Sequence, residues 1–292
     1  MNCRGEKVLL DNFRKLYSEY SIDVQDVIRS AILDDVDIAE FVNSCRDNPY
    51  RLDQIRLALK ENITGGILTI GNGETIREIR NMSAVGVDIS EISRQLENAS
   101  LSEKHISYLL KWVRAGYDTS DIDVSIVPKK LLEAFDYGLM QGRKMGKYSK
   151  CCSGDYILSC LRIEGYNKDV GFLLKSEYQI GVVEYLASFA KQSNRVWQEL
   201  IRHIDSSINR ERIQLLGSIA LCGCSLARLQ EKDKKEYLFT NEALTVVLDA
   251  CQRKVDVSNV ICNTYNEREL KTRFAEIDLN KGKTVQVKLR KG

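Results

Sequence analysis

The sequence contains little proline, little histidine and no long apolar run. Its 292 residues include two prolines, Pro49 and Pro128, and two histidines, His105 and His203. Proline interrupts helices, so its scarcity is compatible with a largely helical chain. A transmembrane helix needs about 20 consecutive apolar residues, and the first residues lack the apolar core of a signal peptide. We therefore expect a cytoplasmic protein with no membrane partner.

Cysteine is present in an odd number, nine, at irregular spacings. This usage favours free thiols in a reducing compartment over a disulfide framework. Structural zinc needs two separated pairs such as C-x₂-C, typically with histidine. Neither Cys151–Cys152 nor Cys222 with Cys224 has that spacing, so these thiols are interpreted as small core or turn residues.

Recognisable catalytic and cofactor motifs are also missing. The two histidines lie in predicted helices, and no serine lies in G-x-S-x-G. The segment "GGILTIGNGET" lacks the lysine of a phosphate-binding loop, and the acidic pairs lack the spacing of a calcium loop. The sequence therefore predicts no catalytic, cofactor-binding or metal-binding residue. The glycine-rich segment Gly65–Gly73 is expected to loop out from the helices.

The sequence does contain one short motif, the repeated phrase, that occurs four times. "SIDVQD", "DVDIAE", "GVDISE" and "GYDTSD" each hold an aspartate followed three residues later by an acid, at Asp23/Asp26, Asp37/Glu40, Asp88/Glu91 and Asp118/Asp121. Aspartate caps the free N–H groups of a helix start, and a second acid favours the positive helix end. The phrase predicts a corner at which one helix ends and the next begins.

The helices before these corners also align without gaps. The segments are "VIRSAILDDVDIA", "QIRLALKENIT", "EIRNMSAVGVDIS" and "YLLKWVRAGYDTS", with a looser fifth copy, "AFDYGLMQGRKM". An apolar pair at i and i+3 marks one helix face. A turn-prone residue follows at Asp35, Asn62, Gly86, Gly116 and Gly142. Copies recur at a period of 20–50 residues, which is typical of arrays whose units pack on their neighbours.

The predicted fold class is therefore all-α. Residues 1–147 are expected to form a solenoid-like array of short paired helices, and residues 153–262 to form a helical bundle. Near the end, apolar and polar residues alternate within "AEIDL" and within "TVQVKL", and "NKGK" between them is a turn. This pattern predicts a β-hairpin over residues 270–292 docked on the bundle.

The phrases "QIRLAL" and "EIRNMSAVGVDIS" resemble a helical repeat of proteins from clostridial and other Gram-positive mobile genetic elements. Its units have the form Gln-x-x-x-Ile-Arg-x-Gly-Leu-x-x-Gly-Leu-Asp-Val-Ser. The resemblance covers residues 25–145, with Leu57 or Asn81 where glycine is usual. It implies a bacterial origin on a phage or plasmid, and it carries no activity or catalytic residue.

Charge is distributed unevenly. Residues 1–142 hold 17 basic and 23 acidic side chains, a balance of −6, and the other residues hold 26 and 18, a balance of +8. Two basic clusters are candidate contacts to nucleic acid: Arg143, Lys144, Lys147 and Lys150, then Lys281, Lys283, Lys288, Arg290 and Lys291. Phosphate contact needs such charge, and base stacking needs aromatic residues that are sparse here.

Two functions follow from these patterns, and a third hypothesis, an enzyme whose residues are assembled from distant parts of the chain, stays open. The leading hypothesis is a non-enzymatic helical-repeat protein-interaction module, an accessory protein of a phage or plasmid that modulates a host or defence complex. The alternative is a nucleic-acid-binding protein that uses the basic C-terminal half. No cofactor is expected in either case.

Overall fold

The computed structural model is all-α, which confirms the helical class. It describes residues 17–69, 72–97, 101–176, 178–230, 239–255, 257 and 268–277. Within these ranges the regular elements are helices, and no strand is present. None of the described helices has the length and apolar character needed to cross a membrane. The chain divides into two compact units, Met1–Lys150 and Cys151–Gly292.

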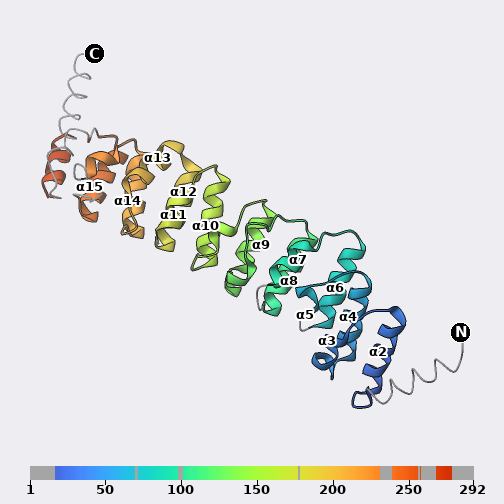
Figure 1. Ribbon diagram of the computed structural model, residues 1–292. Helices are drawn as coiled ribbons and strands as arrows, with labels where there is room; N and C mark the ends of the chain where they lie inside the picture. The colour runs from blue at the N-terminus through green and yellow to red at the C-terminus, as the bar shows by residue number, and fades with distance from the viewer. Residues whose placement is uncertain are drawn as a thin grey trace, which may run out of the picture. The chain divides into compact units, whose positions relative to one another are not determined.

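The first unit consists of helices that pack on nearby helices along the chain (Figure 1). They are α2 (Ile22–Asp34), α3 (Ala39–Val42), α4 (Pro49–Lys60), α5 (Gly66–Thr69), α6 (Gly73–Ala84), α7 (Ser90–Glu97), α8 (Glu103–Arg114) and α9 (Leu132–Met140). Short 3-10 turns are η1 (Asn43–Cys45), η2 (Val124–Ile126), η3 (Lys129–Leu131) and η4 (Gly146–Tyr148). Helix α4 packs between α2 and α6, α5 packs on α7, and α8 contacts α7 and α9.

The helix face predicted from the aligned segments forms the core of this unit. The residues at its first position are each at most 4% exposed: Ile28, Ile55, Ile79, Leu109 and Phe135. Three residues further on, Ala31, Ala58, Met82 and Trp112 are at most 3% exposed, and Gly138 is also buried. Burial of this apolar face is the main stabilising contribution that such short helices gain.

The predicted turn position is confirmed in all five copies. Asp35, Asn62, Gly86, Gly116 and Gly142 have φ between 56° and 83°, in the left-handed region. The next backbone N–H donates to the carbonyl five residues earlier, as from Val36 to Ala31 at 2.9 Å and from Val87 to Met82 at 3.0 Å. This is the bond pattern of a Schellman motif, which ends each helix at the same point of the repeat.

The aspartates of the repeated phrase behave in two ways. Asp37 and Asp88 accept hydrogen bonds from the backbone N–H two residues later, each at 2.9 Å, and a helix follows. Asp118 makes the same bond to Ser120 at 3.1 Å, but no helix begins there and the next element is η2. The predicted helix start is therefore wrong at Asp118.

The start of α2 corrects the prediction at Asp23. The cap of this helix is Ser21, whose hydroxyl accepts from the Val24 N–H at 3.4 Å, so Asp23 already lies inside the helix. Asn48 caps α4 as predicted, by accepting from the Arg51 N–H at 2.9 Å ahead of Pro49 in the first turn.

The glycine-rich segment does not loop out as expected. Gly66–Thr69 form the short helix α5, and Ile67 and Leu68 are 0% and 3% exposed. Helix α6 then begins at Gly73. Burial of the apolar pair Ile67 and Leu68 stabilises this segment by more free energy than the ordering of the flanking glycines costs.

The second unit continues the same kind of packing. Its helices are α10 (Gly154–Gly165), α11 (Gly171–Lys175), α12 (Ile180–Gln192), α13 (Asn194–His203), α14 (Arg210–Leu221) and α15 (Asn241–Gln252), with the 3-10 turn η5 (Leu226–Leu229). Helix α12 packs on α10, α13 and α14, and α14 packs on α15 (Figure 1).

The left-handed turn of the first unit recurs in the second. Asn167, Gly223 and Lys254 have φ of 56°, 97° and 58°. The N–H groups of Cys224 and Val255 donate to carbonyls five residues earlier, at 3.3 and 3.0 Å. The sequence predicts the array only for residues 1–147, because no clear copy of the aligned segment precedes these later turns.

The predicted C-terminal hairpin is wrong where the structure describes it. Residues 268–277 are helical, and Leu270 and Phe274 are 0% and 1% exposed. The alternation of Ala275, Ile277 and Leu279 suggested a strand, but Leu270 and Phe274 lie four residues apart on one helix face. The rest of the predicted hairpin, 278–292, lies outside the described residues.

Candidate functional site

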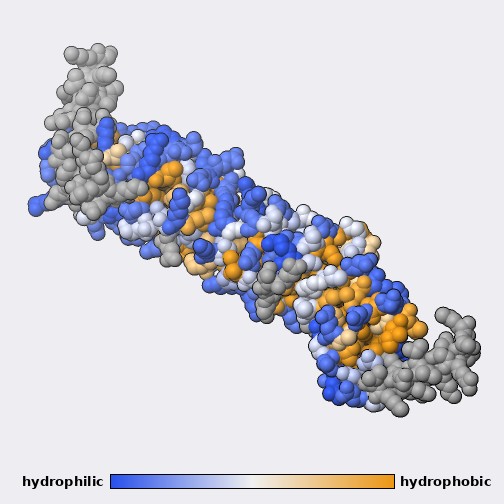
Figure 2. Space-filling model, viewed as in Figure 1, coloured by the Kyte–Doolittle hydropathy of each residue, from blue (hydrophilic) through white to orange (hydrophobic). Residues whose placement is uncertain are grey.

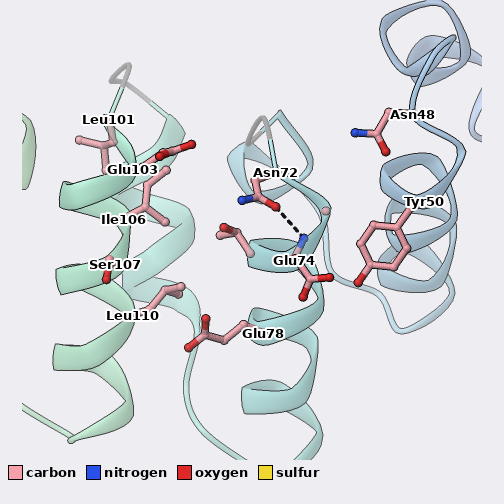
Figure 3. Close-up of a pocket in the computed structure, with 12 residues that line it drawn as sticks. Asn48, Tyr50, Asn72, Glu74, Glu78, Leu101, Glu103, Ile106, Ser107 and Leu110 are labelled. Atoms are coloured by element: carbon pink, nitrogen blue, oxygen red, sulfur yellow. Dashed lines mark hydrogen bonds between the residues drawn. The ribbon is translucent and has the colours of Figure 1, made fainter.

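A pocket of about 780 Å³ lies in the first unit between α4, α6 and α8 (Figure 3). Its lining comes from the starts of α4 and α6 and from one side of α8. The residues are Asn48, Tyr50, Asn72, Gly73, Glu74, Thr75, Glu78, Leu101, Glu103, Ile106, Ser107 and Leu110.

The pocket exists because the regular helix stacking is interrupted there. Helices α2, α4 and α6 pack closely in succession, whereas α8 packs chiefly on α7 and α9 instead of α6. The side of α8 that faces α6 is thus left partly uncovered. Ile106 and Leu110, one turn apart, give this side an apolar wall.

Local sequence fixes the opposite wall. Asn72 caps α6 by accepting from the Glu74 N–H at 2.8 Å. A Cβ at Gly73 would lie 2.9 Å from the Tyr50 ring and 3.1 Å from the Arg51 Cα. Glycine at position 73 therefore allows the start of α6 to lie against the start of α4, beside Tyr50.

All charged residues in the lining are acidic. Glu74 pairs with Arg77, and Glu78 pairs with Arg114 on α8. Glu103 makes no ion pair with any described residue. Arg77 and Arg114 are not lining residues, so the carboxylate oxygens of Glu74 and Glu78 remain part of the pocket wall, as Figure 3 shows.

Tyr50 adds a hydroxyl to this wall. Burial raises the pKa of its phenol, and the neighbouring Glu74 carboxylate raises it further. The phenol therefore keeps its proton at neutral pH and can donate a hydrogen bond. The side chain is 40% exposed, so one side of its ring faces the open space.

The lining favours a cationic, hydrogen-bond-donating ligand. Carboxylate, amide and hydroxyl oxygens accept hydrogen bonds, and an apolar wall can hold the aliphatic stem of a lysine or arginine. A phosphate would meet three carboxylates and no lysine or arginine in the lining, so the pocket disfavours nucleic acid.

The structure describes only the first predicted basic cluster. Lys144, Lys147 and Lys150 are exposed around η4, with the Lys147 ammonium 5.2 Å from the centre of the Tyr148 ring. Arg143 is half-buried, and its Nε is buried without a hydrogen-bond partner among the residues that the structure describes. The second cluster, Lys281, Lys283, Lys288, Arg290 and Lys291, lies outside the described residues, so the structure does not relate the two clusters.

The histidines hold structural positions. His105 is 8% exposed; its Nδ1 lies 2.8 Å from the Ser102 hydroxyl, and its Nε2 lies 2.8 Å from the Val127 carbonyl oxygen. His203 Nδ1 lies 2.6 Å from Gln230 Oε1. In the described part of the chain, no three His, Cys, Asp or Glu side chains are grouped to hold a metal ion.

Sequence reasoning did not find the pocket. Its acidic pair, Glu74 and Glu78, lies one turn apart on a helix, which is an ordinary pattern for a solvated face. Only the space between α6 and α8 distinguishes these glutamates from the others. Comparison of the chain with protein-family models, with curated proteins and with solved structures found no match.

Proposed function

We propose that this chain is a non-enzymatic helical-repeat interaction protein that binds a basic segment of a protein partner in the α4–α6–α8 pocket. The observation that supports it most is the pocket lining, whose charged residues are all glutamates beside an apolar wall. A volume of about 780 Å³ accommodates several side chains of a peptide rather than one ion.

The repeated turn supports the interaction role. Left-handed residues end helices at corresponding points from Asp35 to Lys254, in both units. Chains built in this way present extended surfaces formed by successive repeats, and such surfaces commonly bind proteins. We therefore extend the solenoid-like interpretation to the second unit as part of this proposal.

Apolar side chains on the first unit also fit a protein partner. Figure 2 shows apolar residues among the polar ones on its visible face. Ile32, Leu33 and Val85, near the ends of α2 and α6, are 56%, 80% and 79% exposed. The resemblance to repeats of mobile genetic elements adds the setting: an accessory protein of a phage or plasmid that acts on a host or defence complex.

The test measures binding of the full chain to an array of host-derived peptides, comparing lysine- and arginine-containing segments with acidic segments. Glu103→Lys reverses a lining charge without breaking an ion pair to a described residue. It should weaken binding of basic peptides about tenfold or more, because like charges are then opposed.

The matched control is Glu184→Lys, at an exposed residue of α12 that is outside the pocket lining and makes no ion pair with any described residue. It makes the same change in net charge and should leave the affinity within about twofold, since distant exposed charges are screened by salt. Equal losses in the two variants, or a preference for acidic peptides, would contradict the proposed pocket.

A further inference from the structure

Three cysteines gather at the ends of α14 and α15 in the second unit. Cys222 and Cys224 flank Gly223, whose left-handed φ of 97° turns the chain after α14. Cys251 lies in the last turn of α15. Helix α14 packs on α15, and Arg212 at the start of α14 donates to Asn241 at the start of α15 at 3.2 Å. Both helices have 12 residues, so their ends, with Cys224 and Cys251, lie beside each other.

The two paired thiols are not equivalent. The neighbouring Cys251 thiol lowers the pKa of Cys224 in spite of burial, and the nearby Arg228 guanidinium lowers it further, against the opposing charge of Glu199. The interaction with Cys224 and burial raise the pKa of Cys251. Because the thiolate is the reacting form, Cys224 is the nucleophile of the pair and Cys251 is the resolving thiol.

We propose that Cys224 and Cys251 form a reversible disulfide that fastens the end of α14 to the last turn of α15, with a low-molecular-weight disulfide as the oxidant. The Cys224 thiolate attacks one sulfur of the oxidant, forms a mixed disulfide and releases one thiolate. Cys251 then loses its proton to solvent, attacks the Cys224 sulfur and releases the second thiolate.

The electron and proton balance of this exchange is complete. The protein gives up two electrons and two protons, and the small disulfide becomes two thiols. An excess of small thiol runs the same steps in reverse, so the bond is transient in a reducing compartment.

Other cysteines of this unit provide an internal contrast. Burial raises the pKa of Cys151 to about 11, so at neutral pH this residue is almost entirely the unreactive thiol. Cys160 is 0% exposed and is closed to the oxidant. These two residues should stay reduced under conditions that link Cys224 to Cys251.

The experiment places the full chain in glutathione redox buffers from reducing to oxidising, alkylates the remaining thiols and maps disulfides by mass spectrometry after trypsin digestion. Cys222 and Cys224 share one tryptic peptide, because no lysine or arginine lies between them. Cys222→Ser therefore identifies the sulfur that is linked.

The expected crosslink to the Cys251 peptide appears in wild type and in Cys222→Ser, is lost in Cys224→Ser and disappears when reducing buffer is restored. Loss of the crosslink in Cys222→Ser, or three alkylated thiols in the most oxidising buffer, would overturn the assignment.

A second readout does not depend on the folding of any variant. Wild-type chain unfolded in urea should give less of this crosslink than native chain, because only the fold brings the two thiols together. Equal yields in the two states would also overturn the proposal. Neither result depends on the α4–α6–α8 pocket.

Discussion

One buried amide, Gln95, links α7 to the segment before α9. Its Nε2 donates to the Ile122 carbonyl at 2.6 Å and to Glu91 at 2.8 Å, and its Oε1 accepts from the Val124 N–H at 3.0 Å. The side chain is 4% exposed. Buried polar groups carry a large cost when they lose their partner, so this amide specifies where the segment lies.

Gln95→Ala should lower the free energy of unfolding by about 1–3 kcal/mol, because the backbone groups of Ile122 and Val124 are left without their partner. Urea denaturation followed by circular dichroism measures the change. Gln141→Ala, at an exposed glutamine after α9, should change it by less than about 0.5 kcal/mol. Similar values for the two variants would show that the Gln95 bonds contribute little.

Single residues also show how far the sequence could predict the fold. Asp35, Asn62 and three glycines were identified as left-handed because several aligned copies shared turn-prone types. Lys254 adopts the same φ, although lysine has no intrinsic preference for it. Its conformation follows from the packing of α15, which periodicity in one sequence does not reveal.

At the scale of elements, the two residues of the repeated Ile-Arg pair have separate roles. The isoleucines Ile55 and Ile79 are buried, and the arginines beside them reach back from α4 to the end of α2 and from α6 to α4 and its end. Arg56 pairs with Asp34, and Arg80 pairs with Glu61 and donates to Gln54 at 2.8 Å. Both arginine side chains are at most 16% exposed, so these pairs fix the register between neighbouring repeats as well as adding stability.

The contact of α12 with α14 depends on a glycine. A Cβ at Gly217 would overlap the Phe189 ring, which is 4% exposed. Gly217→Ala should therefore destabilise the second unit by about 1–3 kcal/mol through overpacking. Thermal unfolding of the full chain measures this effect.

Gly165→Ala is the matched control, because a Cβ at this residue in α10 would meet no atom within 4 Å. Alanine is the better helix former, so this change should be neutral or stabilising by up to about 1 kcal/mol. If Gly217→Ala is as harmless as Gly165→Ala, the two helices do not pack as closely as described.

The candidate pocket illustrates the limit of sequence reasoning at this scale. Cap residues such as Asn48 could be predicted from local chemistry, since a cap acts within its own turn. The gap between α6 and α8 could not, because it depends on α8 packing on α7 and α9. The same holds for the approach of Cys224, in the turn after α14, to Cys251 in α15, because it depends on how the two helices pack.

At the scale of the whole molecule, charge is the feature that separates the two proposed functions. The balance is −6 over residues 1–142 and +8 over the other residues. The acidic pocket uses the first part of the chain, whereas nucleic-acid binding would use the second. Removing the basic end is therefore a direct test, provided that the cut preserves folded residues.

A cut before residue 270 would not meet that condition, because it removes the buried Leu270 and Phe274. A chain that ends at Ile277 keeps both and still loses Lys281, Lys283, Lys288, Arg290 and Lys291. If these residues contact phosphates, each lost contact should flatten the slope of log affinity against log salt by about 0.7–0.9.

We expect the full chain to bind single- and double-stranded DNA and RNA only weakly, with a Kd of about 10⁻⁴–10⁻⁶ M at physiological salt. We also expect the shortened chain to keep its affinity for basic peptides, since the pocket lies in the first unit. Salt titrations of both chains measure the two affinities side by side. Nanomolar nucleic-acid binding that the truncation abolishes would instead favour the basic C-terminal half as the functional surface, because non-specific contacts alone do not reach that affinity at physiological salt.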